Sequence, residues 1–340
     1  MRLTKPGADR ILSKWGLKAD KLRKFENEGG YVNENWLFRC KDENYVLRKV
    51  TFFDAEELSF DMEYMLALRK YLPYEMPVPI RNKRNRYFER HGNKIFWIYR
   101  YVEGEKKTNH SIKEVLEYAR VLGTYHKLLL RLKLHGKRDD SDPFRIKAVG
   151  NSIKADVRRR SKRKGKRPFE VIYLKWAARL LPLYKRLDKE RYLSLDFYPI
   201  HGDIDSDNVL WKEDKISAIL DFEHVYYEKP FIRDLIVPIF RYCKNGNMPW
   251  ALDLNKTVIF LKEYSKFRKL GRGEIAEIPD VLVANYIEDF DYSFSLIKKP
   301  HYPKQGVKDG TEYIVQMAKG ALWCDRNREL IRKRLLKSLH

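Results

Sequence analysis

The stretch that most constrains this chain runs from Ile200 to Trp211 and reads IHGDIDSDNVLW. It holds three aspartates, one histidine and one asparagine, with apolar residues on both sides. Acids are the minority elsewhere, since Lys and Arg number 70 against 47 Asp and Glu, and the formal net charge is +23. A cluster of carboxylates in so basic a chain indicates a bound cation, a proton to be moved, or both.

The spacing of three residues suggests which chemistry is involved. Asp203 and Asn208 are five residues apart, and Asp221 follows thirteen residues later, at the end of the apolar run ISAIL. Phosphoryl transfer from ATP needs a carboxylate that orients and deprotonates the attacking hydroxyl, and oxygen ligands for Mg²⁺. Protein kinases present these groups in the order H-R-D-x-x-x-x-N and then D-F-G. Here the order is H-G-D-I-D-S-D-N and then D-F-E.

The rest of the chain divides by its hydrophobic pattern near residue 103. Before that point we expect an amphipathic helix over 8–24, a second helix in the segment AEELSFDMEYMLALRKYLP, and strands over 31–40, 44–50, 86–90 and 94–102. After it the pattern is mostly helical, with helices over 111–135, 169–191 and from about 232 onward. We therefore predict an α+β chain with a β-rich lobe over 1–103 and a helical lobe over 104–340.

These motifs resemble the aminoglycoside phosphotransferase and choline kinase family, whose members phosphorylate hydroxyl groups of small molecules. The family signature H-G-D-x-x-x-x-N, followed by a strand ending I-D-[FW]-[DE], is similar to HGDIDSDN and ILDFE. The resemblance implies a bilobal protein-kinase-like fold, with a small antiparallel sheet and one inserted helix in the nucleotide-binding lobe. It also implies Asp203 as the catalytic base and Asn208 and Asp221 as Mg²⁺ ligands. His201 and Asp234 would be structural.

The N-terminal half carries a weaker resemblance to the same family. The strand YVLRKV ends in a cation where the kinase pattern has its phosphate-binding lysine. Strand side chains alternate between faces, so only one of Arg48 and Lys49 can point at the nucleotide, and Arg48 is favoured. Glu63 is expected to pair with it, and Glu56 and Glu57 are the alternatives.

The remaining nucleotide-binding positions also follow from the resemblance, which covers most of residues 25 to 240. Gly29 and Gly30 would belong to the loop over the phosphates. Tyr99, Tyr101 and Val102 would offer backbone groups to adenine from the edge strand and hinge.

The segment over 136–168 is strongly basic and includes RRRSKRKGKR at 158–167. A run of charge is usually a solvated face, but this one could also select an anionic acceptor or bind RNA or an acidic surface. It lacks regular aromatic interleaving, which disfavours a platform for stacking bases.

Other features of the sequence suggest a cytoplasmic protein. The N-terminus has no apolar segment typical of a signal peptide, and no apolar run is long enough for a membrane span. Cys40, Cys243 and Cys324 are far apart, with no metal-ligand spacing, so we expect reduced thiols. The sequence does not indicate an oligomeric state.

The function expected from these observations is that of an ATP- and Mg²⁺-dependent small-molecule kinase. The family resemblance allows aminoglycosides, choline or ethanolamine, homoserine, sugars and other hydroxyl compounds as acceptors. The basic charge of the chain disfavours a polycationic acceptor. The alternative is a non-catalytic kinase-like protein that holds an anionic partner with its basic insert.

Overall fold

The computed structural model describes residues 3–25, 33–51, 55–108, 110–223, 225–299 and 302–340. The chain forms two compact units, and each is built from several segments. The first comprises residues 1–117, 128–137 and 201–227, and the second comprises 118–127, 138–200 and 228–340. The stretch that contains Asp203 and Asp221 therefore belongs to the same unit as the N-terminal strands.

A five-stranded antiparallel sheet forms the core of the first unit, in the order β1-β2-β3-β5-β4. Its strands are β1 (Lys21–Lys24), β2 (Glu34–Cys40), β3 (Glu43–Val50), β5 (Lys94–Arg100) and β4 (Phe88–His91). Helix α2 (Ala55–Arg69) follows β3 in the chain. An antiparallel sheet with one inserted helix is what the sequence predicts for this part, and the prediction is confirmed.

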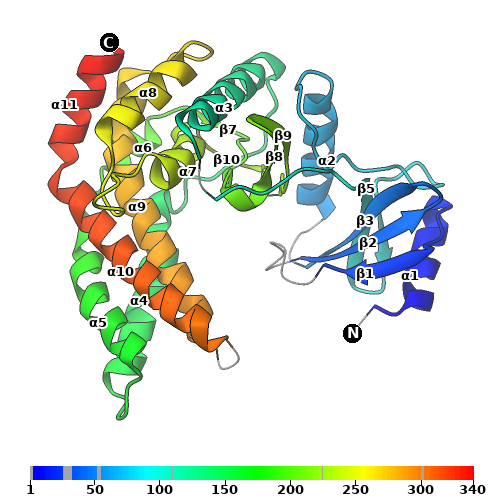
Figure 1. Cartoon of the computed structure of the whole chain (residues 1–340), viewed down its shortest axis with the longest axis horizontal. Coiled ribbons are helices and arrows are strands. Elements are labelled where there is room, and N and C mark those ends of the chain that lie inside the picture. The colour runs from blue at the N-terminus through cyan, green and yellow to red at the C-terminus, as the bar shows by residue number, and fades with distance from the viewer. Residues whose placement is uncertain (1–2, 26–32, 52–54, 109, 224, 300–301) are drawn as a thin grey trace. The chain divides into compact units, whose positions relative to one another are not determined.

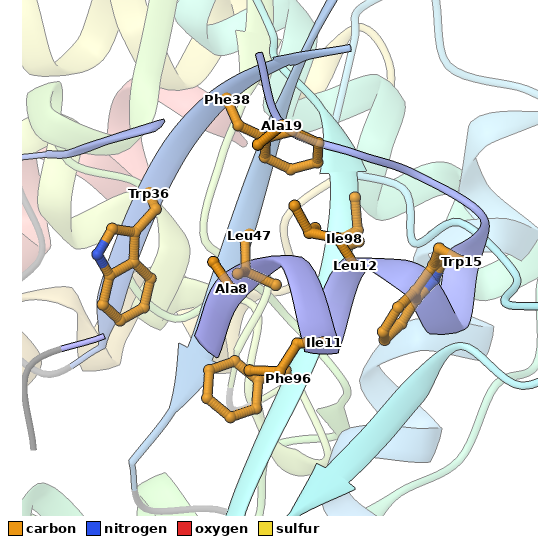
Figure 2. Packing of buried hydrophobic residues seen from close by; sticks show 10 residues of the cluster. All are labelled: Ala8, Ile11, Leu12, Trp15, Ala19, Trp36, Phe38, Leu47, Phe96 and Ile98. Carbon is orange, nitrogen blue, oxygen red and sulfur yellow. The ribbon is translucent and has the colours of Figure 1, made fainter. Parts of the chain in front are cut away.

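The N-terminal segment covers one face of this sheet. Helix α1 (Lys5–Leu12) and the 3₁₀ turn η1 (Ser13–Trp15) pack Ile11, Leu12 and Trp15 against the strands (Figures 1 and 2). Removal of this apolar surface from water stabilises the unit, by about 1.5–3 kcal/mol for each fully buried large side chain. The predicted helix over 8–24 is wrong beyond η1, because Gly16 has a φ of 76° and the chain then enters β1.

A short hairpin carries the acidic stretch and is fixed to two other segments of the first unit. Strands β8 (Val209–Lys212) and β9 (Lys215–Ile219) pair antiparallel. The N–H of Trp211 donates to the carbonyl of Glu105 at 2.8 Å, and the N–H of Ile219 donates to that of Glu75 at 3.0 Å. The hairpin is therefore held along both strands.

The second unit is mostly helical, as predicted for the C-terminal part of the chain. Helix α9 (Arg272–Ile297) is apolar around most of its surface and packs against α10, α11, α4 and α7 (Figure 1). The other helices are α3 (Ile112–Leu132, shared between the units), α4 (Ile146–Ser161), α5 (Pro168–Leu180), α6 (Lys189–Leu193), α7 (Ile232–Tyr242), α8 (Leu254–Ser265), α10 (Lys304–Arg326) and α11 (Arg328–Leu339). The short segments are η2 (Pro143–Arg145), η3 (Leu181–Arg186) and a small sheet of β6 (Lys137–Arg138), β10 (Tyr227–Pro230) and β7 (Phe197–Tyr198).

Two further features bear on the sequence predictions. In the described ranges, no helix combines the length and the apolar character needed to cross a bilayer. Cys40, Cys243 and Cys324 are free thiols, and the last two are buried.

Candidate active site

The loop before β8 brings Asp203 and Asn208 into direct contact. The Asn208 side-chain amide donates to the main-chain carbonyl of Asp203 at 2.9 Å and to its Oδ2 at 3.1 Å. A one-turn 3₁₀ helix, η4 (Ser206–Asn208), makes this contact possible, and Asp205 caps it by accepting from the N–H of Ser206 at 2.6 Å. Asn208 is buried whereas Asp203 is exposed, so a buried amide orients an accessible carboxylate.

His201 packs behind this loop, as the sequence predicts. Its ring is buried, and its Nε2 lies 2.8 Å from the carbonyl oxygen of Leu220. The N–H of Asp203 donates to Nδ1 at 3.3 Å, so the proton of a neutral ring belongs on Nε2. The ring also meets Phe222 edge to face, at 4.7 Å between centroids. His201 therefore links the loop to the segment that follows β9.

Asp221 lies just after β9 and faces Arg48 on β3. Its φ of 64° turns the backbone sharply, and the N–H of Leu220 donates to the carbonyl of Asn208 at 2.8 Å. This bond holds the two predicted metal ligands on adjacent segments. Oδ1 of Asp221 accepts from an Arg48 guanidinium nitrogen at 2.7 Å, and about a third of the Asp221 side chain is exposed.

Arg48 and Lys49 are neighbours on β3, so their side chains point to opposite faces of the strand. The side chain of Arg48 is 8% exposed and lies beside Asp221, whereas Lys49 forms an ion pair with Glu34 across the β2–β3 ladder. Arg48 is therefore the cation of this strand that reaches the acidic segment, and Lys49 is held elsewhere.

A second carboxylate, which the sequence prediction missed, completes the partners of Arg48. Oε1 of Glu223 lies 2.7 Å from Nε of Arg48, and its other oxygen accepts from the side-chain amide of Asn33. Burial raises the pKa of Glu223 to about 7, with a further increase from nearby Asp221, against the lowering effects of Arg48 and Asn33. The sequence did carry a signal for this residue, because Glu223 is the third letter of D-F-E and occupies the [DE] position of the family signature.

The expected pair between Arg48 and Glu63 is not formed, and this is a correction. Glu63 is exposed on α2, whereas its neighbours Met62 and Tyr64 are buried. The alternatives Glu56 and Glu57 instead accept hydrogen bonds from two tyrosine hydroxyls, those of Tyr226 and Tyr227 respectively.

The other positions predicted to bind nucleotide are only partly within the described residues. Gly29 and Gly30 lie outside the described residues. Tyr99 is buried beside Arg48, and burial raises its pKa to about 12. The N–H of Tyr101 donates to the carbonyl of Asn44 at 2.9 Å, so this group is not directed at a base. Val102 follows β5 in the chain and is half-buried.

The donor set is of the kind that Mg²⁺ prefers. Asn208 uses its amide nitrogen to hold Asp203, so its amide oxygen is the atom suited to a cation, and Asp221 adds a carboxylate. In the part of the chain that the structure describes, no cluster of three or more His, Cys, Asp or Glu has metal-binding geometry. Two protein ligands are nevertheless enough for Mg²⁺ when phosphate oxygens and water complete its shell.

A separate network in the second unit contains His126 and Asp234. His126 is fully buried, with Nε2 at 3.0 Å from Asp234 and Nδ1 at 2.8 Å from the hydroxyl of Tyr264. Burial lowers the pKa of His126, so the ring is neutral. Both residues are therefore buried in a structural network, which is the role expected of Asp234.

Comparison with known proteins defines the fold as protein-kinase-like. A spectinomycin phosphotransferase in complex with ADP and spectinomycin matches with a TM-score of 0.67 and 13% identity, over 96% of this chain and all of that chain. An aminoglycoside phosphotransferase from Alicyclobacillus acidocaldarius matches with a TM-score of 0.64 and 15% identity, over 95% and 96%. A microcompartment-associated aminopropanol kinase matches with a TM-score of 0.60 and 14% identity, over 96% and 98%. At these identities the likeness concerns the fold alone.

Sequence comparison identifies the family. The model of the phosphotransferase enzyme family matches residues 26–268, and the chain belongs to this family. A homoserine kinase of Methylobacillus glycogenes is 28% identical over 107 residues, which span 32% of this chain and 32% of that protein.

Proposed function

We propose that this protein is an ATP- and Mg²⁺-dependent phosphotransferase that phosphorylates a hydroxyl group of a small molecule. The observation that carries the proposal is the contact between Asp203 and Asn208 beside the Arg48–Asp221 pair, all within one compact unit. Membership of the phosphotransferase enzyme family supports it, as do structural neighbours bound to ADP and to an ATP analogue.

Asp203 is proposed as the catalytic base. Its accessible carboxylate, oriented by the Asn208 amide, would hydrogen-bond the acceptor hydroxyl and take its proton as the O–P bond forms. Phosphoryl transfer has a loose transition state, so positioning the hydroxyl in line with the leaving group matters more than strong basicity. An exposed aspartate is suited to this task.

Asn208 and Asp221 are proposed to hold the metal, and Arg48 to contact the phosphates. When bound, Mg²⁺ would neutralise charge on the phosphate oxygens. Arg48 has five N–H groups and lies in ion pairs with Asp221 and Glu223, so donors remain for a phosphate oxygen. Glu223 would fix the guanidinium, the task that a helix glutamate performs in protein kinases.

The acceptor is proposed to be a small alcohol. The local similarity to a homoserine kinase and the neighbours that act on aminopropanol or spectinomycin all support this class. Fold and nucleotide motifs do not choose among its members, because they recognise ATP and not the acceptor.

Thermal unfolding tests the nucleotide site directly. We expect Mg²⁺ plus ATP to raise the melting temperature by several degrees, and ATP with a chelator to raise it much less. ADP release in a panel of homoserine, amino alcohols, choline, sugars and aminoglycosides then identifies the acceptor. If neither a shift nor turnover is observed, the non-catalytic alternative is favoured.

A further inference from the structure

The basic run of the sequence surrounds a cavity in the second unit. Four arginines and one lysine line a space of about 460 Å³: Arg159, Arg160, Arg163, Arg167 and Lys298. They come from the end of α4, the turn into α5 and the residue that caps the C-terminus of α9. In Figure 1 this turn lies at the lower end of the unit. None of the five lining residues belongs to the loop that contains Asp203.

Two buried carboxylates organise these cations. Glu170 is fully buried and forms ion pairs with Arg160, Arg163 and Arg167, while its other oxygen also accepts from the N–H of Arg167 at 2.8 Å. Burial would raise the pKa of Glu170, but these hydrogen bonds and charges outweigh it, so the carboxyl is ionised. Asp156 likewise accepts from Lys298 at 2.6 Å. The guanidinium of Arg160, whose side chain is 8% exposed, is thus held in place before any ligand arrives, while Arg163 and Arg167 contact Glu170 less closely, at 3.5 Å.

The cavity keeps an excess of positive charge after these pairs are counted. Five cations face Asp156 and Glu170, and the next carboxylate that influences Lys298 is Asp291, which accepts from the hydroxyl of Tyr173 at 3.2 Å. At least two positive charges therefore remain unbalanced. Residues 157–169 contain no acid, so the flanking lysines add to the excess. Such a surplus in a concave site favours an anionic ligand.

The chemistry of the lining narrows the class of anion. Arg159, Arg163 and Arg167 are 68%, 54% and 43% exposed at their side chains and are accessible to a solute, while Arg160 is 8% exposed and forms the base. Guanidinium forks match the oxygen pairs of phosphate better than a lysine does. The volume is in the range of small-molecule sites, larger than one phosphate group needs.

We propose that this cavity, named the arginine cavity, binds a soluble oligophosphate, a compact anion with two or more linked phosphate groups. Stacking of nucleic-acid bases does not fit, because the nearby rings of Phe169 and Phe294 are buried and covered by Arg167 and Arg160. The proposal is independent of the phosphotransferase activity, since none of the lining residues belongs to the candidate active site.

Calorimetric titration with inorganic tripolyphosphate, in 150 mM salt and EDTA, tests the proposal on the full chain. We expect one site, with affinity at least tenfold weaker in the Arg163→Ala/Arg167→Ala variant. The matched control is Lys162→Ala/Lys164→Ala, which removes the same charge from the same segment outside the lining and should change affinity less than threefold. Arg48→Ala, titrated under conditions where circular dichroism shows a folded chain, should bind as the wild type does, which separates this site from the proposed nucleotide site.

Several results would overturn the proposal. Absence of saturable binding, equal weakening by both double variants, or loss of binding in Arg48→Ala would each assign the signal to diffuse charge or to the other unit. Tighter binding of single-stranded RNA or of vesicles that contain anionic lipid, with equal loss in the lysine variant, would indicate a macromolecular surface instead.

Discussion

Asp203 is the residue whose chemistry is most directly testable. The Asp203→Asn substitution keeps the shape and the contact with Asn208 but removes the proton acceptor. We expect turnover to fall by about 10²- to 10⁴-fold while the stabilisation by Mg²⁺ plus ATP is retained. The control is Asp207→Asn, which changes a 66% exposed carboxylate of the same loop and should leave turnover within about twofold. Retention of more than a tenth of the turnover in Asp203→Asn would exclude its role as base.

Arg48 and Lys49 form a matched pair for testing strand alternation. The Arg48→Met substitution leaves Asp221 and Glu223 close together without their cation, and we expect a loss of about 3–5 kcal/mol in the free energy of unfolding. The Lys49→Met substitution removes a pair whose glutamate, Glu34, is 30% exposed, and should cost less than about 1 kcal/mol. Urea unfolding at fixed pH measures both, and equal losses would contradict the assignment of faces.

At the scale of single residues, the sequence predicts which residues belong to the candidate site better than it predicts which side chains they contact. Motif order was enough to propose Asp203, Asn208 and Asp221 together. Alternation allowed only one of Arg48 and Lys49 to face the nucleotide, and the register of the kinase pattern favoured Arg48. The pairing of Arg48 with Glu223 was missed, because the [DE] position of the signature gives only the residue type and the pairing depends on the left-handed turn at Asp221. The sequence of α2 did not show that Glu63 is exposed, because its apolar residues are spread around the helix.

At the scale of elements, the contact between α9 and α10 places the backbone of Gly320 against an aromatic ring. A methyl group at Gly320 would overlap the buried ring of Tyr286, whose hydroxyl is anchored to the carbonyl of Trp250 at 3.0 Å. We expect Gly320→Ala to cost about 1–3 kcal/mol through overpacking. The control, Gly150→Ala in α4, meets nothing nearer than 3.9 Å and should stabilise by about 0.5–1 kcal/mol. Equal effects in thermal unfolding would contradict this contact.

Helix α9 also contains a buried carboxyl group, that of Glu277, which makes the free energy of unfolding of the protein depend on pH. Glu277 is fully buried, neither of its oxygens accepts a hydrogen bond from the described residues, and the nearest cation is Arg191 at 3.7 Å. Burial raises the pKa of Glu277 to about 8, against lowering by Arg191, Arg332 and Arg328 and a further increase from Asp188.

The direction of this pH effect follows from the raised pKa. The folded state holds the proton of Glu277 more tightly than the unfolded chain does. The contribution of this proton to the free energy of unfolding is therefore full below pH 4.5 and is lost as pH rises through about 8. Relative to Glu277→Gln, the wild type should lose at most about 1.4 kcal/mol of unfolding free energy per pH unit in that window. The free energies of unfolding of the two proteins are measured with urea from pH 5 to pH 8, and a constant difference between them over this range would contradict the prediction.

The elements themselves were predictable where their pattern is local. Most helices and strands lie where they were expected, but β1 was assigned to a helix. The helix expected over 169–191 ends at Leu180, and η3 and α6 follow it. The identity of β1 depends on pairing between Lys21 and Arg39, a distant partner that no local periodicity reveals. The 136–168 segment shows the same limit, because α4 was hidden by its high content of charge.

At the scale of the whole molecule, the expected lobes were two continuous segments, 1–103 and 104–340, and this division stays a prediction. Contacts instead group residues 201–227 with the N-terminal strands. The reason is the pairing of the β8–β9 hairpin with Glu75 and Glu105, which sequence patterns do not encode.

Because each unit contains one proposed site, two ligands should protect two different parts of the chain from hydrogen exchange. Binding lowers the frequency of local opening around a site. We expect Mg²⁺ plus ATP to slow exchange in β3 and in residues 201–223, with little change in residues 156–170. Tripolyphosphate in EDTA should do the reverse, and the Arg163→Ala/Arg167→Ala variant should lose that second pattern while keeping the first. Slowing of 156–170 by Mg²⁺ plus ATP would mean that the nucleotide occupies the arginine cavity, and it would contradict the assignment of separate sites.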